Sequence, residues 1–369
     1  MSDEHTAEDE AEATASANVS TPRETATLIG HAAAEAALLE AYACGRLPHA
    51  WLITGPRGVG KATLAFRFAR FLFNAEASAG GLFAAPPASL ALPPEDPIFR
   101  RVASGGHPDL LVIERGFDPR RRRLRSEIVV ADTRGIASFL RLTPAEGGWR
   151  VVILDGADAM NRNAANAVLK ILEEPPRRAV LLLVSDNPGR LLPTIRSRCR
   201  RLALRPLAPA VVEEALRRAR PDLAPADAAA LASLAEGSIG RALSLAAHDG
   251  LSLYRRLTGL LAELPGIRGE ALHDFADELL RGGGEERFTL LGEILPGWLA
   301  RGVAQAAAGG TAAPGEGEIM ARLAARRGLD QWVEVWENLT HLFAEADSIN
   351  LDRKQVVLNA FFALDAAAR

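Results

Sequence analysis

The chain has 369 residues, a formal net charge of −3 and only two cysteines. Two cysteines supply no disulfide framework, the length predicts two or three domains, and no apolar stretch is long and charge-free enough to span a membrane. All but three of the 43 basic residues are arginine, the exceptions being Lys61, Lys170 and Lys354. A lysine inside a motif is therefore more informative here than in an average chain.

Residues 1–22 differ in composition from the rest. Six acidic residues fall within the first twelve positions, and no Lys or Arg precedes Arg23. The segment lacks the basic start and apolar core of a signal peptide, and its Ala, Ser, Thr and Glu content predicts a disordered acidic tail. Without these six charges the rest of the chain is mildly basic, at about +3.

The first motif joins a strand, a Gly-rich loop and a helix. The apolar run His49–Thr54 leads into GPRGVGKAT at 55–63, and a helical pattern follows. This context favours a P-loop, whose backbone N–H groups surround phosphate oxygens while the lysine reaches the β- and γ-phosphates. A Gly-rich turn without a ligand is the alternative. The residues expected to line the site are Gly55, Gly58, Gly60, Lys61, Ala62 and Thr63.

Two groups that drive ATP hydrolysis are absent from the sequence. The residue after Lys61 is normally Ser or Thr, whose hydroxyl holds Mg²⁺, but here it is Ala62, and Thr63 lies about 100° further around the helix. The apolar run Val151–Asp155 predicts a buried parallel strand that ends in the metal-handling carboxylate, yet Gly156 follows it where an active ATPase usually has the water-orienting glutamate. ATP or ADP, with Mg²⁺ only alongside it, is a possible ligand, and hydrolysis is not expected.

The next stretch completes an α/β domain. Asn163–Pro176 predicts a helix closed by two prolines, and Val180–Val184 predicts a second buried strand. The polar residues Ser185-Asp186-Asn187 follow that strand, where they form either a nucleotide sensor or a turn. Ser197-Arg198-Cys199 then ends a helix–turn before a last short strand.

In this order the motifs resemble those of bacterial clamp-loader subunits of the AAA+ family. The likeness covers roughly residues 25–250. It is carried by GPRGVGKAT at 55–63, SGGHPDLLVIE at 104–114, LRSEI at 124–128, NAANAVLKILEEPP at 163–176, LLPTIRSRC at 191–199 and GSIGRAL at 237–243. The resemblance implies a hetero-pentamer with gamma/tau-type and delta subunits, which opens the sliding clamp and places it on primed-template DNA in the cytoplasm.

The resemblance also implies roles for two arginines. A stator-type subunit of this family does not hydrolyse ATP, and the arginine of its Ser-Arg-Cys motif, here Arg198, completes a neighbour's ATP site. A finger supplied in trans is worth roughly 10³–10⁵ in rate. A solvated surface arginine is the alternative, and Arg196, expected to face solvent or DNA, is the fallback. Arg241 is either a sensor for the chain's own nucleotide or an ordinary helix-start arginine, in a helix capped by Ser238 or Gly237.

Two segments bear on other ligands. Related subunits often carry a four-cysteine zinc module where residues 74–107 lie, and this interval contains no cysteine. Because structural zinc needs four thiolate or imidazole ligands, we predict no zinc and a loop. The run Pro119–Arg125 either contacts DNA phosphates non-specifically or, as we favour, forms a solvated hairpin tip.

The expected fold class is α/β plus all-α. We predict an acidic tail (1–22), an AAA+ P-loop parallel-sheet domain (23–206), a small helical lid domain (207–255) and a C-terminal helical collar domain (256–369). Loops are expected at Arg281–Glu286 and Gly309–Glu318, and Asp352 with Gln355 predicts a helix start. One helix places an apolar face on Trp332, Val335, Trp336, Leu339, Leu342, Phe343 and Ala346.

Three functions fit these patterns. We favour a catalytically silent clamp-loader subunit that contributes Arg198 to a neighbour. An active AAA+ ATPase and a purely structural scaffold subunit are the alternatives. Ala62 and Gly156 argue against the active ATPase.

Overall fold

The computed structural model describes all residues except 1–20, 79–88, 119–122, 147, 309–315 and 350. The described residues form two compact units, 21–243 and 244–369, whose boundary falls inside helix α10 (Ile239–Ala247). The domain boundaries at 206 and 255 stay predictions, and the acidic tail lies almost wholly outside the described residues.

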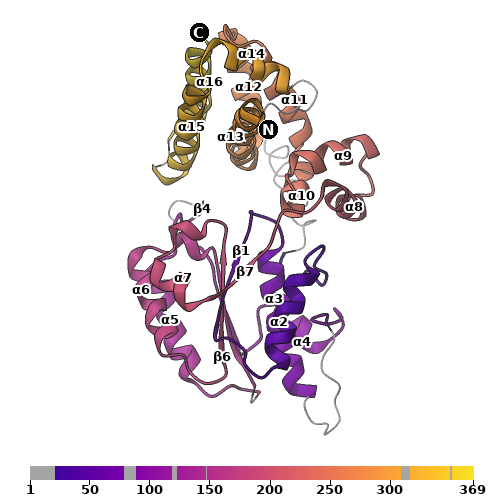
Figure 1. The fold of residues 1–369 in the computed structure, drawn as a ribbon, viewed down its shortest axis with the longest axis vertical. Coiled ribbons are helices and arrows are strands. Elements are labelled where there is room, and N and C mark those ends of the chain that lie inside the picture. Colours follow the sequence, from indigo (N-terminus) through magenta and orange to yellow (C-terminus); the bar gives the residue numbers. More distant parts are fainter. Residues whose placement is uncertain (1–20, 79–88, 119–122, 147, 309–315, 350) are drawn as a thin grey trace, which may run out of the picture. The chain divides into compact units, whose positions relative to one another are not determined.

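A five-stranded parallel sheet forms the centre of the first unit (Figure 1). Its order is β2-β5-β6-β1-β7, so β6 lies between β5 and β1. The strands are β1 (Ala50–Thr54), β2 (Leu110–Ile113), β5 (Arg150–Asp155), β6 (Ala179–Ser185) and β7 (Arg200–Ala203). β1, β5 and β6 are apolar along nearly their whole length because helices cover both faces of the sheet. The α/β class predicted for this part is confirmed.

Helices cover the two faces in separate sets (Figure 1). One set packs on Trp51, Ile53 and Val151, and the other on Leu52 and Val152, because successive strand residues point to opposite faces. The first set is α2 (Ala32–Ala43), α3 (Lys61–Ser78) and α4 (Pro97–Ala103), and the second is α5 (Val130–Arg141), α6 (Arg162–Glu173) and α7 (Pro193–Arg198). Two single turns, η1 (Ala157–Ala159) and η2 (Pro188–Arg190), lie in the connections after β5 and β6.

The described end of the Arg-rich run, from Arg123, lies on a small antiparallel hairpin. β3 (Phe117–Asp118) pairs with β4 (Arg123–Leu124), with Phe117 opposite Leu124. The predicted hairpin is confirmed, whereas its tip at 119–122 lies outside the described residues. Contact of this tip with DNA therefore stays a prediction.

Short helices follow the sheet. They are α8 (Pro209–Ala219), α9 (Pro225–Leu234) and α10, and the first two have proline in the first turn, where its missing N–H is tolerated. Ser238 precedes α10, and its Oγ accepts a hydrogen bond from Arg241 N at 3.1 Å. The predicted cap is therefore Ser238.

In its described residues the second unit consists of helices and their connections, as predicted for the all-α part of the fold. Its helices are α11 (Gly250–Ala262), α12 (Gly269–Leu279), α13 (Glu285–Ala308), α14 (Glu316–Arg326), α15 (Leu329–Ile349) and α16 (Arg353–Ala368), with the short turn η3 (Arg281–Gly283). α13 packs against α11, α14 and α15, and α16 packs against α12 and α15. The predicted start of α16 is confirmed, because Asp352 Oδ1 accepts from Gln355 N at 2.9 Å.

Two loop predictions in this unit were partly wrong. α13 already begins at Glu285, and α14 begins at Glu316, so the ends of both expected loops are helical. Paired glutamates in each first turn favour a helix start because they face the positive end of the helix dipole. On α15, Trp332, Leu339, Phe343 and Ala346 are buried, whereas Val335, Trp336 and Leu342 are half-buried.

Candidate functional site

Three connections meet at the carboxyl edge of the sheet. The Gly-rich loop follows β1, Asp155 ends β5, and Ser185-Asp186 lie at the end of β6, between the other two strands. Parallel sheets bind ligands at this edge. Gly55, Gly58 and Gly60 have φ of 151°, 73° and 112° in the loop, and Lys61, Ala62 and Thr63 form the first turn of α3. The structure thus brings the sequence-predicted loop residues and Asp155 to one edge.

The Lys61 ammonium has two partners within the protein. Its Nζ lies 2.6 Å from Asp186 Oδ1 and donates to Pro56 O at 2.6 Å, and the side chain is only 4% exposed. A phosphate that approaches the loop therefore meets an ammonium already neutralised by a carboxylate. The sequence does not indicate this pair, because the two residues lie far apart and Asp186 is read as a sensor or turn residue.

Asp155 lies within an acidic neighbourhood. Burial raises the pKa of its carboxyl, and repulsion from Asp186 and Glu114 adds to the effect, whereas Lys61 opposes it. A cation at this edge would relieve the repulsion between the three carboxylates. Lys61 supplies one such charge in the structure.

The turn after β6 is fixed by other polar groups. Asp158 accepts hydrogen bonds from the backbone N–H groups of Asp186 at 3.2 Å and Asn187 at 3.3 Å. Asn187 Oδ1 accepts from Gly189 N at 3.2 Å, which makes it a turn residue. Ser185 is fully buried, and its Oγ has no hydrogen-bond partner in the described part of the chain.

The lid helix α10 closes over the Gly-rich loop within the first unit. Ser238 Oγ donates to Arg57 O at 2.8 Å, and Gly240 N donates to Gly58 O at 2.9 Å. A Cβ on Gly58 would lie 2.6 Å from Ser238 Oγ, so glycine is required for this approach as well as for its φ of 73°. His31 Nε2 lies 2.9 Å from the next carbonyl oxygen, that of Val59. Three successive loop carbonyls, those of Arg57, Gly58 and Val59, therefore have partners outside the loop.

Arg241 also has an internal carboxylate partner. Its Nη1 donates to Glu236 Oε2 at 3.0 Å, across the turn that leads into α10. Glu236 itself has a φ of 52°, a left-handed conformation that non-glycine residues rarely adopt. The predicted sensor arginine thus lies beside the Gly-rich loop but is paired with a neighbouring residue of its own segment.

Arg198 lies in the layer formed by helices α5, α6 and α7, away from the Gly-rich loop. It is the last residue of α7 and is 37% exposed. Its Nη2 lies 3.0 Å from Glu173 Oε1, at the end of α6, and its Nη1 donates to Thr194 O at 3.1 Å. Lys61 and Arg198 thus pair with different carboxylates, Asp186 and Glu173 respectively.

The residues beside Arg198 are anchored in the core. Ile195 and Cys199 are buried, and burial raises the pKa of the Cys199 thiol to about 12. Arg196, expected to face solvent or DNA, is half-buried with its Nε enclosed. Of the two arginines, Arg198 is the one presented to solvent.

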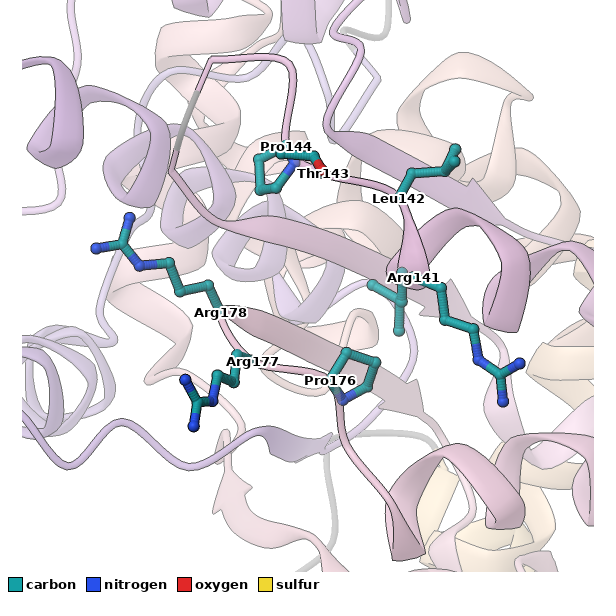
Figure 2. Close-up of a pocket in the computed structure, with 8 residues that line it drawn as sticks. Arg141, Leu142, Thr143, Pro144, Pro176, Arg177 and Arg178 are labelled. Atoms are coloured by element: carbon teal, nitrogen blue, oxygen red, sulfur yellow. The ribbon is translucent and has the colours of Figure 1, made fainter.

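A hollow lies at the opposite, amino edge of the sheet. Its wall consists of the end of α5 and the segment that leads into β6, with Leu140, Arg141, Leu142, Thr143, Pro144, Pro176, Arg177 and Arg178 as lining residues. In Figure 2 the Arg177 and Arg178 side chains extend to one side of the view and that of Arg141 to the other. The three guanidinium groups therefore do not gather around one point in the hollow.

The described part of the chain offers neither a metal cluster nor a membrane span. Among these residues, no three His, Cys, Asp or Glu side chains are grouped to hold a metal ion. Within the same ranges no helix has the length and apolarity to cross a membrane. The prediction of no zinc continues to rest on the cysteine count.

Comparison with known proteins identifies relatives of the first unit. Residues 30–208 match the family described as "DNA polymerase III, delta subunit". The DNA polymerase III subunit delta' of Pseudomonas aeruginosa is 41% identical over 174 residues, which cover 47% of this chain and 48% of that protein. The Bacillus subtilis subunit delta' is 33% identical over 205 residues, 55% of each chain.

Further relatives reach past the sheet domain. The Escherichia coli DNA polymerase III subunit tau is 30% identical over 281 residues, 74% of this chain and 40% of that protein. The chain thus spans about half the length of the curated relatives it matches. Among solved structures, a gamma subunit-related protein of Thermotoga maritima gives a TM-score of 0.41 at 18% identity, covering 90% of this chain and 100% of that one.

Proposed function

We propose that this chain, which is a DNA polymerase III delta'-like protein over residues 30–208, works as a stator in a clamp loader and completes a neighbour's ATP site with Arg198. Its partners are gamma/tau-type and delta subunits, the sliding clamp and primed DNA, in the cytoplasm. The observation that carries the proposal is the contrast in exposure between two paired cations. Lys61 is buried against Asp186, whereas Arg198, which pairs with Glu173, is 37% exposed at the end of α7.

The chain's own residues fit a reacting Mg²⁺–ATP complex poorly. Ala62 has no hydroxyl for the metal, Gly156 has no carboxylate to orient water, and Lys61 is neutralised by Asp186. Loss of such positioned groups costs orders of magnitude in rate. The loop keeps the backbone N–H groups that can bind phosphate. Because the groups needed for hydrolysis are absent, any nucleotide bound there serves a structural role and is not hydrolysed.

Arg198 has the properties of a group that acts on another subunit. Its guanidinium is permanently charged, its α7 anchor is buried at Ile195, and it is partly open to solvent. A cation in this position stabilises the charge that develops on a γ-phosphate in a neighbouring site.

The test is ATP turnover by the reconstituted loader, with partner subunits, clamp and primed DNA. Arg198→Ala is expected to lower the turnover by roughly 10³-fold while the pentamer still assembles. Arg190→Ala is the matched control, because Arg190 is an exposed arginine on η2, a few residues upstream. Unchanged turnover with Arg198→Ala would leave the chain as a scaffold. Steady hydrolysis by the isolated chain, abolished by Lys61→Ala, would make it an active ATPase.

A further inference from the structure

We infer that Glu173 is a positioning residue for Arg198: its carboxylate holds the guanidinium in the orientation that a neighbour's nucleotide requires. This inference rests on the proposed function and adds a second residue to it. Neither the sequence motifs nor the comparisons assign Glu173 a role.

Arg198 is held from two directions. Glu173 Oε1 lies 3.0 Å from Nη2, and Thr194 O accepts from Nη1 at 3.1 Å. The backbone carbonyl belongs to the same helix turn, so it fixes the near side of the guanidinium. The carboxylate comes from a different helix and fixes the rotation of the planar group.

Both anchors of this pair are rigid. α6 begins at a cap in which Asn161 Oδ1 accepts from Ala164 N at 3.0 Å, and its last turn buries Ile171 and Leu172. Two prolines then follow, which cannot continue a helix, so Glu173 is the last helical residue. α6 packs directly on α7, whose Ile195 is fully buried.

The exposure of the two side chains indicates that the pair orients Arg198 more than it stabilises the fold. The Glu173 side chain is 45% exposed and that of Arg198 is 37% exposed. Ion pairs in water contribute little to folding, because solvation competes with them. A contact that adds little stability but fixes a long, flexible side chain lowers the entropy cost of forming the reacting arrangement.

The experiment is a steady-state ATPase assay of the complete loader with Glu173→Ala, Glu173→Gln and the matched control Glu174→Ala. Glu174 is the adjacent exposed carboxylate at the same helix end. Glu173→Ala is expected to lower kcat about tenfold with an unchanged KM for ATP, because orientation matters in the transition state. Glu173→Gln retains an oxygen acceptor and should recover most of the loss. Glu174→Ala should behave like the unaltered chain.

A double-variant comparison separates positioning from any other effect. Glu173→Ala added to Arg198→Ala is expected to cause no further loss, because the group that it positions is gone. A further loss in that background, or full or raised activity of Glu173→Ala alone, would overturn the inference. If Arg198→Ala itself has no effect, it is the proposed function that fails, and the two failures are therefore distinguishable.

Discussion

Lys61 Nζ and Asp186 Oδ1 lie 2.6 Å apart, with the lysine almost completely buried. The pair joins the start of α3 to the end of β6 across the carboxyl edge of the sheet. Arg241 is likewise paired, with Glu236. Both cations that a bound nucleotide would recruit are thus occupied by carboxylates of the same chain.

Asp186→Asn should open the Gly-rich loop to nucleotide. The change removes the charge that neutralises Lys61 but keeps the side-chain size, so we expect the affinity of the isolated chain for ATP to rise by at least about tenfold. Titration calorimetry with ATP and ADP measures it. Glu114→Gln is the control, since Glu114 is an acid near Asp155 that pairs with Arg23 at 3.9 Å and not with Lys61. Equal affinities of the variant and the unaltered chain would show that Asp186 is not what limits binding.

Gly58→Ala should detach the lid from the Gly-rich loop. The new Cβ would lie 2.6 Å from Ser238 Oγ and 3.0 Å from Arg241 N, at a φ of 73°. We expect a loss of about 2–4 kcal/mol in the free energy of unfolding, measured in urea. Gly45→Ala is a matched control, because Gly45 has a φ of 65° but nothing within 4 Å of an added Cβ. Its cost should be limited to backbone strain, about 1–2 kcal/mol. Equal losses would mean that the lid contact contributes nothing.

Arg150→Met should destabilise the first unit strongly. The buried guanidinium donates to Thr143 O at 2.7 Å and to Phe139 O at 2.5 Å, and lies 3.3 Å from Asp109 Oδ1. Its removal leaves the Asp109 carboxylate buried without a cation, at an expected cost of about 3–5 kcal/mol. Arg141→Met, at an exposed arginine nearby, should change the unfolding free energy by no more than about 0.5 kcal/mol. A small effect of Arg150→Met would contradict this account.

The sheet and most helices could be predicted from the sequence because their signals are local. Strands β1, β5 and β6 are apolar runs with polar residues at the carboxyl end, and prolines or caps mark where helices begin. The parallel order of the strands places the loop before Lys61 and the strand end at Asp155 at the same edge of the sheet.

The pairings within the site could not be predicted in the same way. Asp186 and Glu173 each contact a cation far away in sequence, and a carboxylate after a strand or at a helix end has no pattern that names its partner. Arg196 and Arg198 differ by two positions on a short helix, so only packing decides that the first is half-buried and the second exposed.

The stability of the chain should fall as the pH is lowered from neutral, and His107 should contribute to that fall. The ring is buried, stacked on Phe73 at 3.8 Å, and burial lowers its pKa below 6.5, with Glu146 opposing and Arg101 reinforcing the effect. A base whose folded pKa is depressed contributes stability above its unfolded pKa, which is lost as the pH falls through the folded value. His107 Nδ1 accepts a hydrogen bond from Asp109 N at 3.2 Å. His107→Asn keeps an oxygen acceptor for this hydrogen bond, but the amide side chain cannot gain a proton. Unfolding in urea between pH 7.5 and 5 should therefore show a shallower loss of stability for this variant, and parallel curves for the two proteins would contradict the assignment.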